Sequence, residues 1–275
     1  MEYKKGVLSA EELQQMLGIK GWRGRFVSRL AVKLLEIDKA NATQAKFANE
    51  GVLDFVPHAL EDVGIKYEVP PEQLERIPKE GGFITVSNHH YGSVDGLILC
   101  DTVYRRRQDY KLLTNFLLAL IPNLKEVFLP VNNMSSNANA RSVNGIRAAL
   151  NHISSGGALG IFPVPEGQVA TWQDSFKVED KPWAPNMIRF IQKASLPVIP
   201  IYFHGGNSLS FHLLGKIHRR LRTARLIHEL FNKKGKTVQV RIGEPISVEE
   251  MKGMDVASLG KFLRDKTYAL AETCK

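Results

Sequence analysis

Short apolar runs separated by polar or glycine-rich segments characterise the chain after residue 64. The segments 140–154 and 185–194, which lie between such runs, have helical patterns. Strands alternating with helices are typical of an α/β fold whose sheet is covered on both faces. The sequence therefore predicts one α/β domain over residues 63–275, with a mixed, mostly parallel sheet flanked by helices. The predicted strands are Phe83–Ser87, Val127–Val131, Ala158–Phe162, Leu196–Phe203 and Val238–Ile242.

Residues 1–62 have a different pattern and are predicted to form a helical N-terminal extension that lies against a membrane. Ser9 and Glu12 have the spacing of a capping box. Between residues 25 and 37 an apolar stripe runs beside basic residues at four-residue spacing. Such a basic amphipathic helix either docks on the protein with a solvated polar face or lies on a membrane surface, and both interpretations stay open. The stripe contains Phe26, Leu30, Leu34 and Ile37, the basic residues are Arg25, Arg29 and Lys33, and Trp22 and Arg23 precede them.

The net charge of +9, from 37 Lys and Arg against 28 Asp and Glu, favours polyanionic partners. No apolar run reaches the ~18 residues that cross a bilayer, and the nearest, Phe116–Ile121, stops at Pro122. The N-terminus lacks the apolar core of a signal peptide. Cys100 and Cys274 are far apart and form no metal-binding or disulfide framework, which fits a reducing compartment. We therefore expect a peripheral protein at the cytoplasmic face of a membrane.

The segment from Lys216 to Lys236 is also basic, with leucine and isoleucine residues between its cations. Nucleic-acid binding is one interpretation, but the segment lacks the stacking aromatic residues of single-strand binders and any groove-reading motif. Anionic lipid or an acidic acyl carrier protein accounts for the same residues, and a solvated face is a third interpretation. We expect an anionic membrane surface and no nucleic acid as partner. The cations include Arg219, Arg220, Arg222, Arg225, Lys233 and Lys234.

Candidate catalytic residues follow the predicted strand 83–87. The stretch Ser87–Gly96 contains His89, His90 and Asp95, with glycine at positions 92 and 96. A carboxylate that accepts from one imidazole nitrogen fixes the tautomer and leaves the other nitrogen free as a general base. Gly92 permits a tight loop and close approach of a substrate. Alone, these residues also fit a structural pair or a half-formed metal site.

Two later stretches favour a catalytic pair over these other interpretations. Together with the stretch Ser87–Gly96, they follow one another in an order that resembles the glycerolipid (lysophosphatidic acid type) acyltransferase family. Ile161–Gly167 begins at the end of one predicted strand and continues beyond it, and Leu196–Pro200 leads into the stretch 202–207. The chain is most similar to the hemolysin-like branch, which includes enzymes that O-acylate bacterial ornithine and glycine lipids. The resemblance runs from about Val63 to Ile246 and also includes Gly64–Val69, Arg76–Pro78, Gly206–Ser208, Leu221–Thr223 and Arg241–Pro245.

This resemblance implies that His89 and Asp95 are the catalytic pair. The five-residue spacing between His and Asp in the branch selects His89, whereas the commoner four-residue spacing of the family would select His90. His90 stands where the branch usually has proline. A second departure is that Val164 and Pro165 separate Pro163 from Glu166, which displaces this acid relative to the family pattern. The substrate-binding residues implied are Asn88, Gly92, Arg141, Glu166 and Gly167, with Arg147 as the alternative to Arg141.

The implied reaction is transfer of a fatty acyl group from a thioester carrier to a hydroxyl of a lipid acceptor. The acceptor would be a lyso-phospholipid or a lyso-aminolipid, and acyl carrier protein or coenzyme A would carry the acyl group as a co-substrate. No cofactor is expected. Two other classes are open: a non-catalytic peripheral lipid-binding module, and a metal-dependent hydrolase with ligands among His89, His90, Asp95 and His204. The hydrolase lacks a supporting zinc-binding pattern, and we expect no metal site.

Overall fold

The computed structural model describes residues 6–18, 20–114, 118–131, 140–165, 171–172, 178–217, 222 and 225–274. Its centre is a seven-stranded sheet, and five adjacent strands of this sheet run parallel. Strand β9 pairs antiparallel with β8, and β1 runs parallel to β9 at the edge. In spatial order the strands are β1 (Lys66–Glu68), β9 (Thr237–Ile242), β8 (Val198–Phe203), β2 (Phe83–Ser87), β5 (Ala158–Ile161), β3 (Lys111–Thr114) and β4 (Phe128–Pro130). The predicted mixed, mostly parallel α/β sheet is confirmed.

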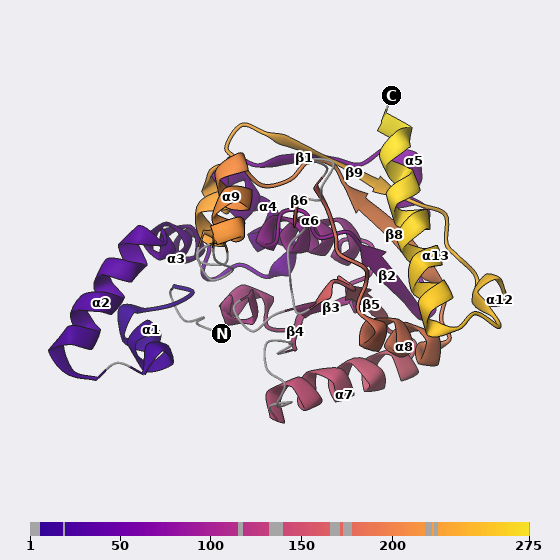
Figure 1. The fold of residues 1–275 in the computed structure, drawn as a ribbon, viewed down its shortest axis with the longest axis horizontal. Helices are drawn as coiled ribbons and strands as arrows, with labels where there is room; N and C mark the ends of the chain where they lie inside the picture. The colour runs from indigo at the N-terminus through magenta and orange to yellow at the C-terminus, as the bar shows by residue number, and fades with distance from the viewer. Residues whose placement is uncertain are drawn as a thin grey trace.

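Helices cover both faces of this sheet, as the apolar strand pattern requires. Adjacent residues of a strand belong to opposite sides: Phe83 packs in the cluster with α4 and α6, and Ile84 in the cluster with α7, α8 and α13. The layers are visible in Figure 1. The helices of the sheet layers are α4 (Val52–Val63), α6 (Ser93–Tyr104), α7 (Ala140–Ser154), α8 (Pro185–Ala194) and α13 (Val256–Ala269).

Shorter elements connect these layers. Ser247 and Glu250 form a capping box at the start of α12. Strands β6 and β7 form a separate antiparallel pair. The connecting elements are α5 (Pro71–Leu74), η1 (Leu118–Leu120), η2 (Pro122–Leu124), β6 (Thr171–Trp172), β7 (Val178–Glu179), α9 (Leu209–Ile217), α11 (Leu226–Phe231), α12 (Val248–Met251) and η4 (Leu270–Cys274).

The N-terminal part is helical, with α1 (Ala10–Leu17), α2 (Gly21–Leu34) and α3 (Ile37–Lys46) at one end of the molecule (Figure 1). The capping box of Ser9 and Glu12 is present. The single helix expected over residues 25–37 is interrupted, because Glu36 adopts a left-handed conformation with φ 57°. Ile37 then turns inward and packs with Leu8 and Leu13. Helix α4 belongs to the main core instead, and the domain boundary near residue 62 stays a prediction.

Candidate active site

His89 and Asp95 meet at the carboxyl end of β2, in the loop that leads into α6. His89 Nδ1 lies 3.1 Å from Asp95 Oδ2, and the two side chains are 10% and 0% exposed. This contact is close but not aligned as a hydrogen bond. Catalytic hydrogen bonds commonly tighten only in the substrate complex, so the geometry permits the expected orientation of the ring. The second ring nitrogen, Nε2, makes no hydrogen bond within the described part of the chain.

The backbone of the loop holds Asp95 in place. Its Oδ2 accepts hydrogen bonds from the Tyr91 and Gly92 amides, at 2.9 and 3.1 Å. Gly92 has φ 87° and ψ −107°, a backbone conformation that residues with a Cβ atom rarely adopt. The glycine therefore lets the chain turn back so that the first turn of α6 presents its carboxylate to His89.

His90 points elsewhere and is buried. Its Nδ1 lies 2.9 Å from the Gly205 carbonyl oxygen, and its Nε2 lies 3.3 Å from the Tyr268 hydroxyl. The ring also packs edge-on against Tyr202. Both nitrogens of His90 are thus engaged in the protein interior, whereas His89 has one nitrogen available.

Two other residues of the sequence motifs, Phe162 and Asn88, are neighbours of His89. Phe162, directly after β5, places its ring 4.4 Å from that of His89, measured between centroids. Asn88 turns toward β8: its Nδ2 donates to the Phe203 carbonyl at 2.9 Å, and its Oδ1 accepts from the Phe203 amide at 2.8 Å. The amide of Asn88 therefore ties the ends of β2 and β8 together, with both of its polar atoms occupied.

Asp180, which sequence reasoning missed, lies behind the catalytic loop. Its carboxylate accepts from the His89 amide at 3.2 and 3.3 Å and from Trp183 Nε1 at 3.4 Å. Burial raises the pKa of Asp180, and the nearby His90 and His89 rings offset part of this rise. Asp180 is 91 residues from His89 in a short polar stretch after β7, so no local pattern marks it.

The remaining predicted substrate-binding residues cannot be placed in this geometry. Glu166 and Gly167 lie outside the described residues. Arg141 belongs to α7, but its side chain also lies outside the described part. Arg147 is exposed on the same helix. His204 follows β8 and packs edge-on against Tyr202, and burial together with Arg241 and His90 lowers its pKa.

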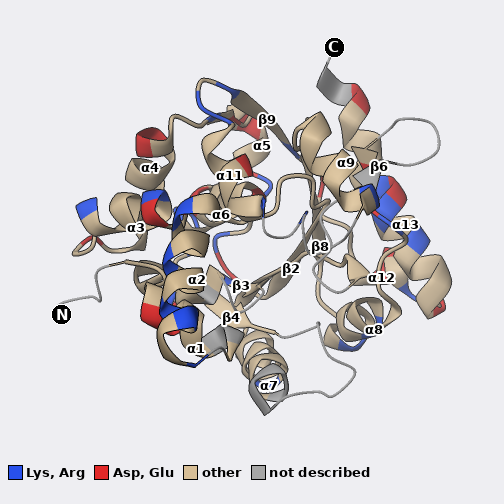
Figure 2. Cartoon of the chain, turned by 60° about the vertical axis from the view of Figure 1, so that its left-hand side comes forward, with Lys and Arg blue, Asp and Glu red and all other residues tan. Residues whose placement is uncertain are grey.

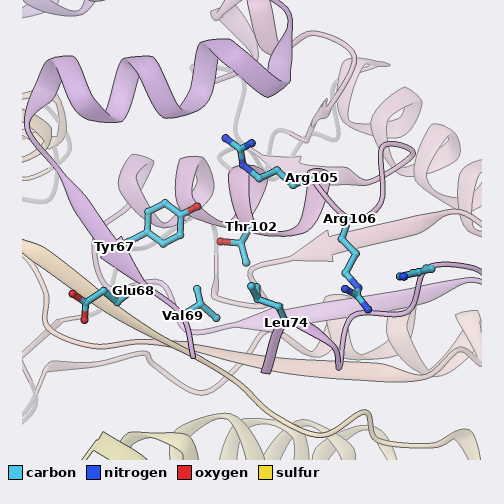
Figure 3. A pocket seen from close by; sticks show the side chains of 8 residues that line it. Tyr67, Glu68, Val69, Leu74, Thr102, Arg105 and Arg106 are labelled. Carbon is cyan, nitrogen blue, oxygen red and sulfur yellow. The ribbon is translucent and has the colours of Figure 1, made fainter. Parts of the chain in front are cut away.

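A pocket of about 750 Å³ lies at the far end of α6 from Asp95. Tyr67 and Glu68 of β1, Leu74 of α5 and Thr102 of α6 line it (Figure 3). Arg105 and Arg106 are also at the pocket, but Arg105 is paired with Asp101 and Arg106 with Glu75. Thr102 is about 10 Å along the helix axis from Asp95, so this pocket is separate from the His89 site.

None of the helices in the described part of the chain combines the length and apolar character that a bilayer span requires. Among the described residues, no three or more His, Cys, Asp or Glu side chains are grouped to hold a metal ion.

Known proteins share both the sequence pattern and the fold. The chain is 27% identical over 255 residues to a lyso-glycine lipid O-acyltransferase of Bacteroides thetaiotaomicron, covering 90% of each protein. It is 25% identical over 256 residues to the lyso-glycine lipid O-acyltransferase of Phocaeicola vulgatus, covering 90% of this chain and 88% of the relative. In fold it is similar to the 1-acyl-sn-glycerophosphate (LPA) acyltransferase PlsC of Thermotoga maritima. That match has a TM-score of 0.52 at 19% identity and covers 90% of this chain and 88% of PlsC. The sequence profile described as "Acyltransferase" matches residues 20–275, and the chain therefore belongs to this acyltransferase family.

Proposed function

We propose that this enzyme transfers a fatty acyl group from a thioester carrier to a hydroxyl of a lyso-aminolipid, with His89 as general base. The observation that carries the proposal is the pairing of His89 Nδ1 with the buried Asp95 carboxylate, which leaves Nε2 available. Similarity to the two lyso-glycine lipid O-acyltransferases supports a lyso-aminolipid over a lyso-phospholipid as acceptor. The acyl donor is an acyl carrier protein or coenzyme A thioester.

In the proposed mechanism, Nε2 of His89 removes the proton of the acceptor hydroxyl while the oxygen attacks the thioester carbonyl carbon. The carbon–sulfur bond then breaks, and the departing thiolate receives the proton from the imidazolium. Asp95 keeps Nδ1 protonated and offsets the positive charge on the ring. Asp180 and Asn88 act as positioning residues, because one binds the His89 amide and the other binds β8.

We also propose that the enzyme works at the cytoplasmic face of a membrane, where its acceptor resides. Helix α2 supports this location, since Trp22, Phe26, Leu30 and Leu34 are exposed on it. Arg23, Arg25, Arg29 and Lys33 are exposed on the same helix, and Figure 2 shows basic positions along it. Such a combination is typical of helices that lie in the interface plane of an anionic bilayer.

The direct test is an assay with purified protein, a lyso-glycine lipid and either acyl carrier protein or coenzyme A thioesters. We expect a doubly acylated lipid from wild type and a loss of about 10²–10⁴-fold in rate for His89→Ala. His152→Ala is a matched control, because His152 lies on α7 and contacts the Ala158 carbonyl away from the site. A protein that binds the lipid but yields no product with any thioester would instead be a lipid-binding module.

A further inference from the structure

Helix α9 has an apolar stripe that nothing in the described part of the chain covers. Leu209, Leu213 and Ile217 are 56%, 47% and 74% exposed. They follow one another at four-residue spacing, which places them on one side of the helix. Phe211 and His212 are buried and dock the opposite side on the protein. The helix is therefore firmly seated, with its large aliphatic side chains directed outward.

The start of α9 adjoins the catalytic loop. The segment before it, residues 204–208, holds this loop through several hydrogen bonds. The Gly205 carbonyl contacts His90, the His204 carbonyl accepts from the Tyr91 hydroxyl at 2.6 Å, and Asn207 donates to the Tyr91 carbonyl at 3.2 Å. Whatever binds the stripe is thus bound next to the loop that carries His89 and Asp95.

A buried ion pair fixes this arrangement. Glu229 of α11 accepts from the Ser208 amide at 2.9 Å and from Lys233 Nζ at 2.6 Å, and both charged side chains are 1% exposed. Lys233 Nζ also lies 5.7 Å from the centroid of the Tyr91 ring. The ion pair therefore connects Ser208, directly before α9, to the catalytic loop. Ile227 of the same helix α11 packs against the cluster formed by α1 and α3.

We propose that the stripe of α9 is a second membrane contact, inserted into the interface of an anionic bilayer beside the active site. This inference rests on the proposed function, in which the acceptor is a lipid. An acyl chain leaves a bilayer at a cost that grows with each CH₂ group, so the surface next to the catalytic loop has to lie at the bilayer. The charge agrees: Lys216 is exposed beside Ile217, and the sequence continues with Arg219 and Arg220.

The test compares binding of the full chain to vesicles of phosphatidylglycerol and phosphatidylcholine. We expect the double variant Leu213→Ser, Ile217→Ser to partition about tenfold less than wild type, given the hydrophobic free energy of such side chains. Leu150→Ser is the matched control, because Leu150 is an exposed leucine on α7, and it should bind like wild type. Unchanged binding of the double variant would overturn the proposal. If light scattering then also showed a smaller oligomer for the double variant, the stripe would be a contact between copies of the chain.

A second readout separates this inference from the proposed function. The acceptor is supplied either within vesicles or as a short-chain analogue dissolved in water. The double variant should lose turnover of the vesicle-bound acceptor while it retains turnover of the dissolved one. Equal loss on both acceptors with wild-type vesicle binding would show that the substitutions disturb the catalytic loop, and would contradict a membrane role. If wild type acylates neither acceptor, the proposed function fails, whereas the vesicle measurement still decides the role of α9.

Discussion

At the scale of single residues, the two adjacent histidines have separate surroundings, and this predicts separate effects of substitution. Asp95→Asn should lower the rate severely, because an amide neither fixes the His89 tautomer nor offsets the imidazolium charge.

His90→Pro should retain appreciable activity, since the ring nitrogens of His90 contact Gly205 and Tyr268 instead of solvent. It should nevertheless lower the free energy of unfolding, because both contacts are lost. Initial rates together with urea unfolding check both variants, and a folded but inactive His90→Pro would make His90 the base.

The motif pattern could predict the two residues that meet at the end of β2, because spacing along one loop determines their proximity. It could not predict Asp180, whose contact with the His89 amide depends on how a distant segment packs. For Asn88 the motif gave the position but the structure supplies the partner: the side chain binds the Phe203 backbone of β8. Contacts between distant segments depend on the tertiary structure, and no local pattern in the sequence reveals them.

At the scale of secondary structure elements, β5 carries a glycine whose replacement should be costly. A Cβ atom at Gly160 would lie 1.9 Å from the Tyr110 hydroxyl, which is fully buried and bonded to Thr85 at 2.7 Å. We expect Gly160→Ala to lower the free energy of unfolding by about 1–3 kcal/mol, the usual cost of overpacking a core. Gly51→Ala, which meets no atom within 4 Å, should cost less than about 1 kcal/mol. Equal effects in chemical denaturation would argue against close packing at Gly160.

A second element-scale prediction concerns acid stability and the Glu229–Lys233 pair of the α11 segment. Burial raises the pKa of Glu229, but hydrogen bonds from Lys233 and Ser208 outweigh this, so its pKa is lowered on folding. The pair therefore contributes stability above the ordinary carboxylate pKa of about 4.5, and this contribution is lost as pH falls through the lower folded value. Glu229→Gln should cost about 3–5 kcal/mol at pH 7, because it leaves a buried charge unpaired.

The measurement is urea unfolding of wild type and Glu229→Gln between pH 7 and pH 3. The difference between the two proteins should shrink as the solution is acidified. Glu249→Gln removes the same charge from an exposed site and should change stability little at any pH. A difference between wild type and Glu229→Gln that stays constant down to pH 3 would show that the pair does not depend on the Glu229 charge.

The pattern of apolar runs predicted five strands of the seven-stranded sheet, namely β2, β4, β5, β8 and β9, and missed β1 and β3. The strands β2, β5 and β8 are buried along their whole length and mostly apolar, so their pattern indicated them directly. Strands β1 and β3 contain no apolar run longer than two residues, and their pairing with β9 and β5 makes them strands. The break between α2 and α3 was also missed, because no glycine or proline marks Glu36. The left-handed conformation of Glu36 is accompanied by the burial of Ile37.

At the scale of the whole molecule, the charge excess predicted a basic surface but not which cations belong to it. Each interpretation of the segment 216–236 requires exposed cations, and the structure corrects this for two of them: Arg222 and Lys233 are buried. Lys233 neutralises Glu229 inside the protein and is not available to lipid. The exposed basic residues of α2 are instead accompanied by exposed apolar ones, Trp22 and Phe26 among them. We therefore expect membrane attachment with an electrostatic part and a hydrophobic part.

The electrostatic and hydrophobic parts of membrane binding should respond differently to salt concentration. Attraction between exposed cations and anionic headgroups is screened over about 10 Å at 0.1 M salt, whereas the insertion of apolar side chains is not screened. Binding to anionic vesicles should therefore fall as salt rises and level off above zero. Arg25→Gln with Arg29→Gln should flatten the salt dependence, while Phe26→Ser with Leu30→Ser should reduce the salt-resistant remainder. Vesicle flotation at a series of salt concentrations measures both effects. If the wild-type protein stays unbound even at low salt, the net charge of +9 does not direct it to membranes, and the peripheral location is wrong.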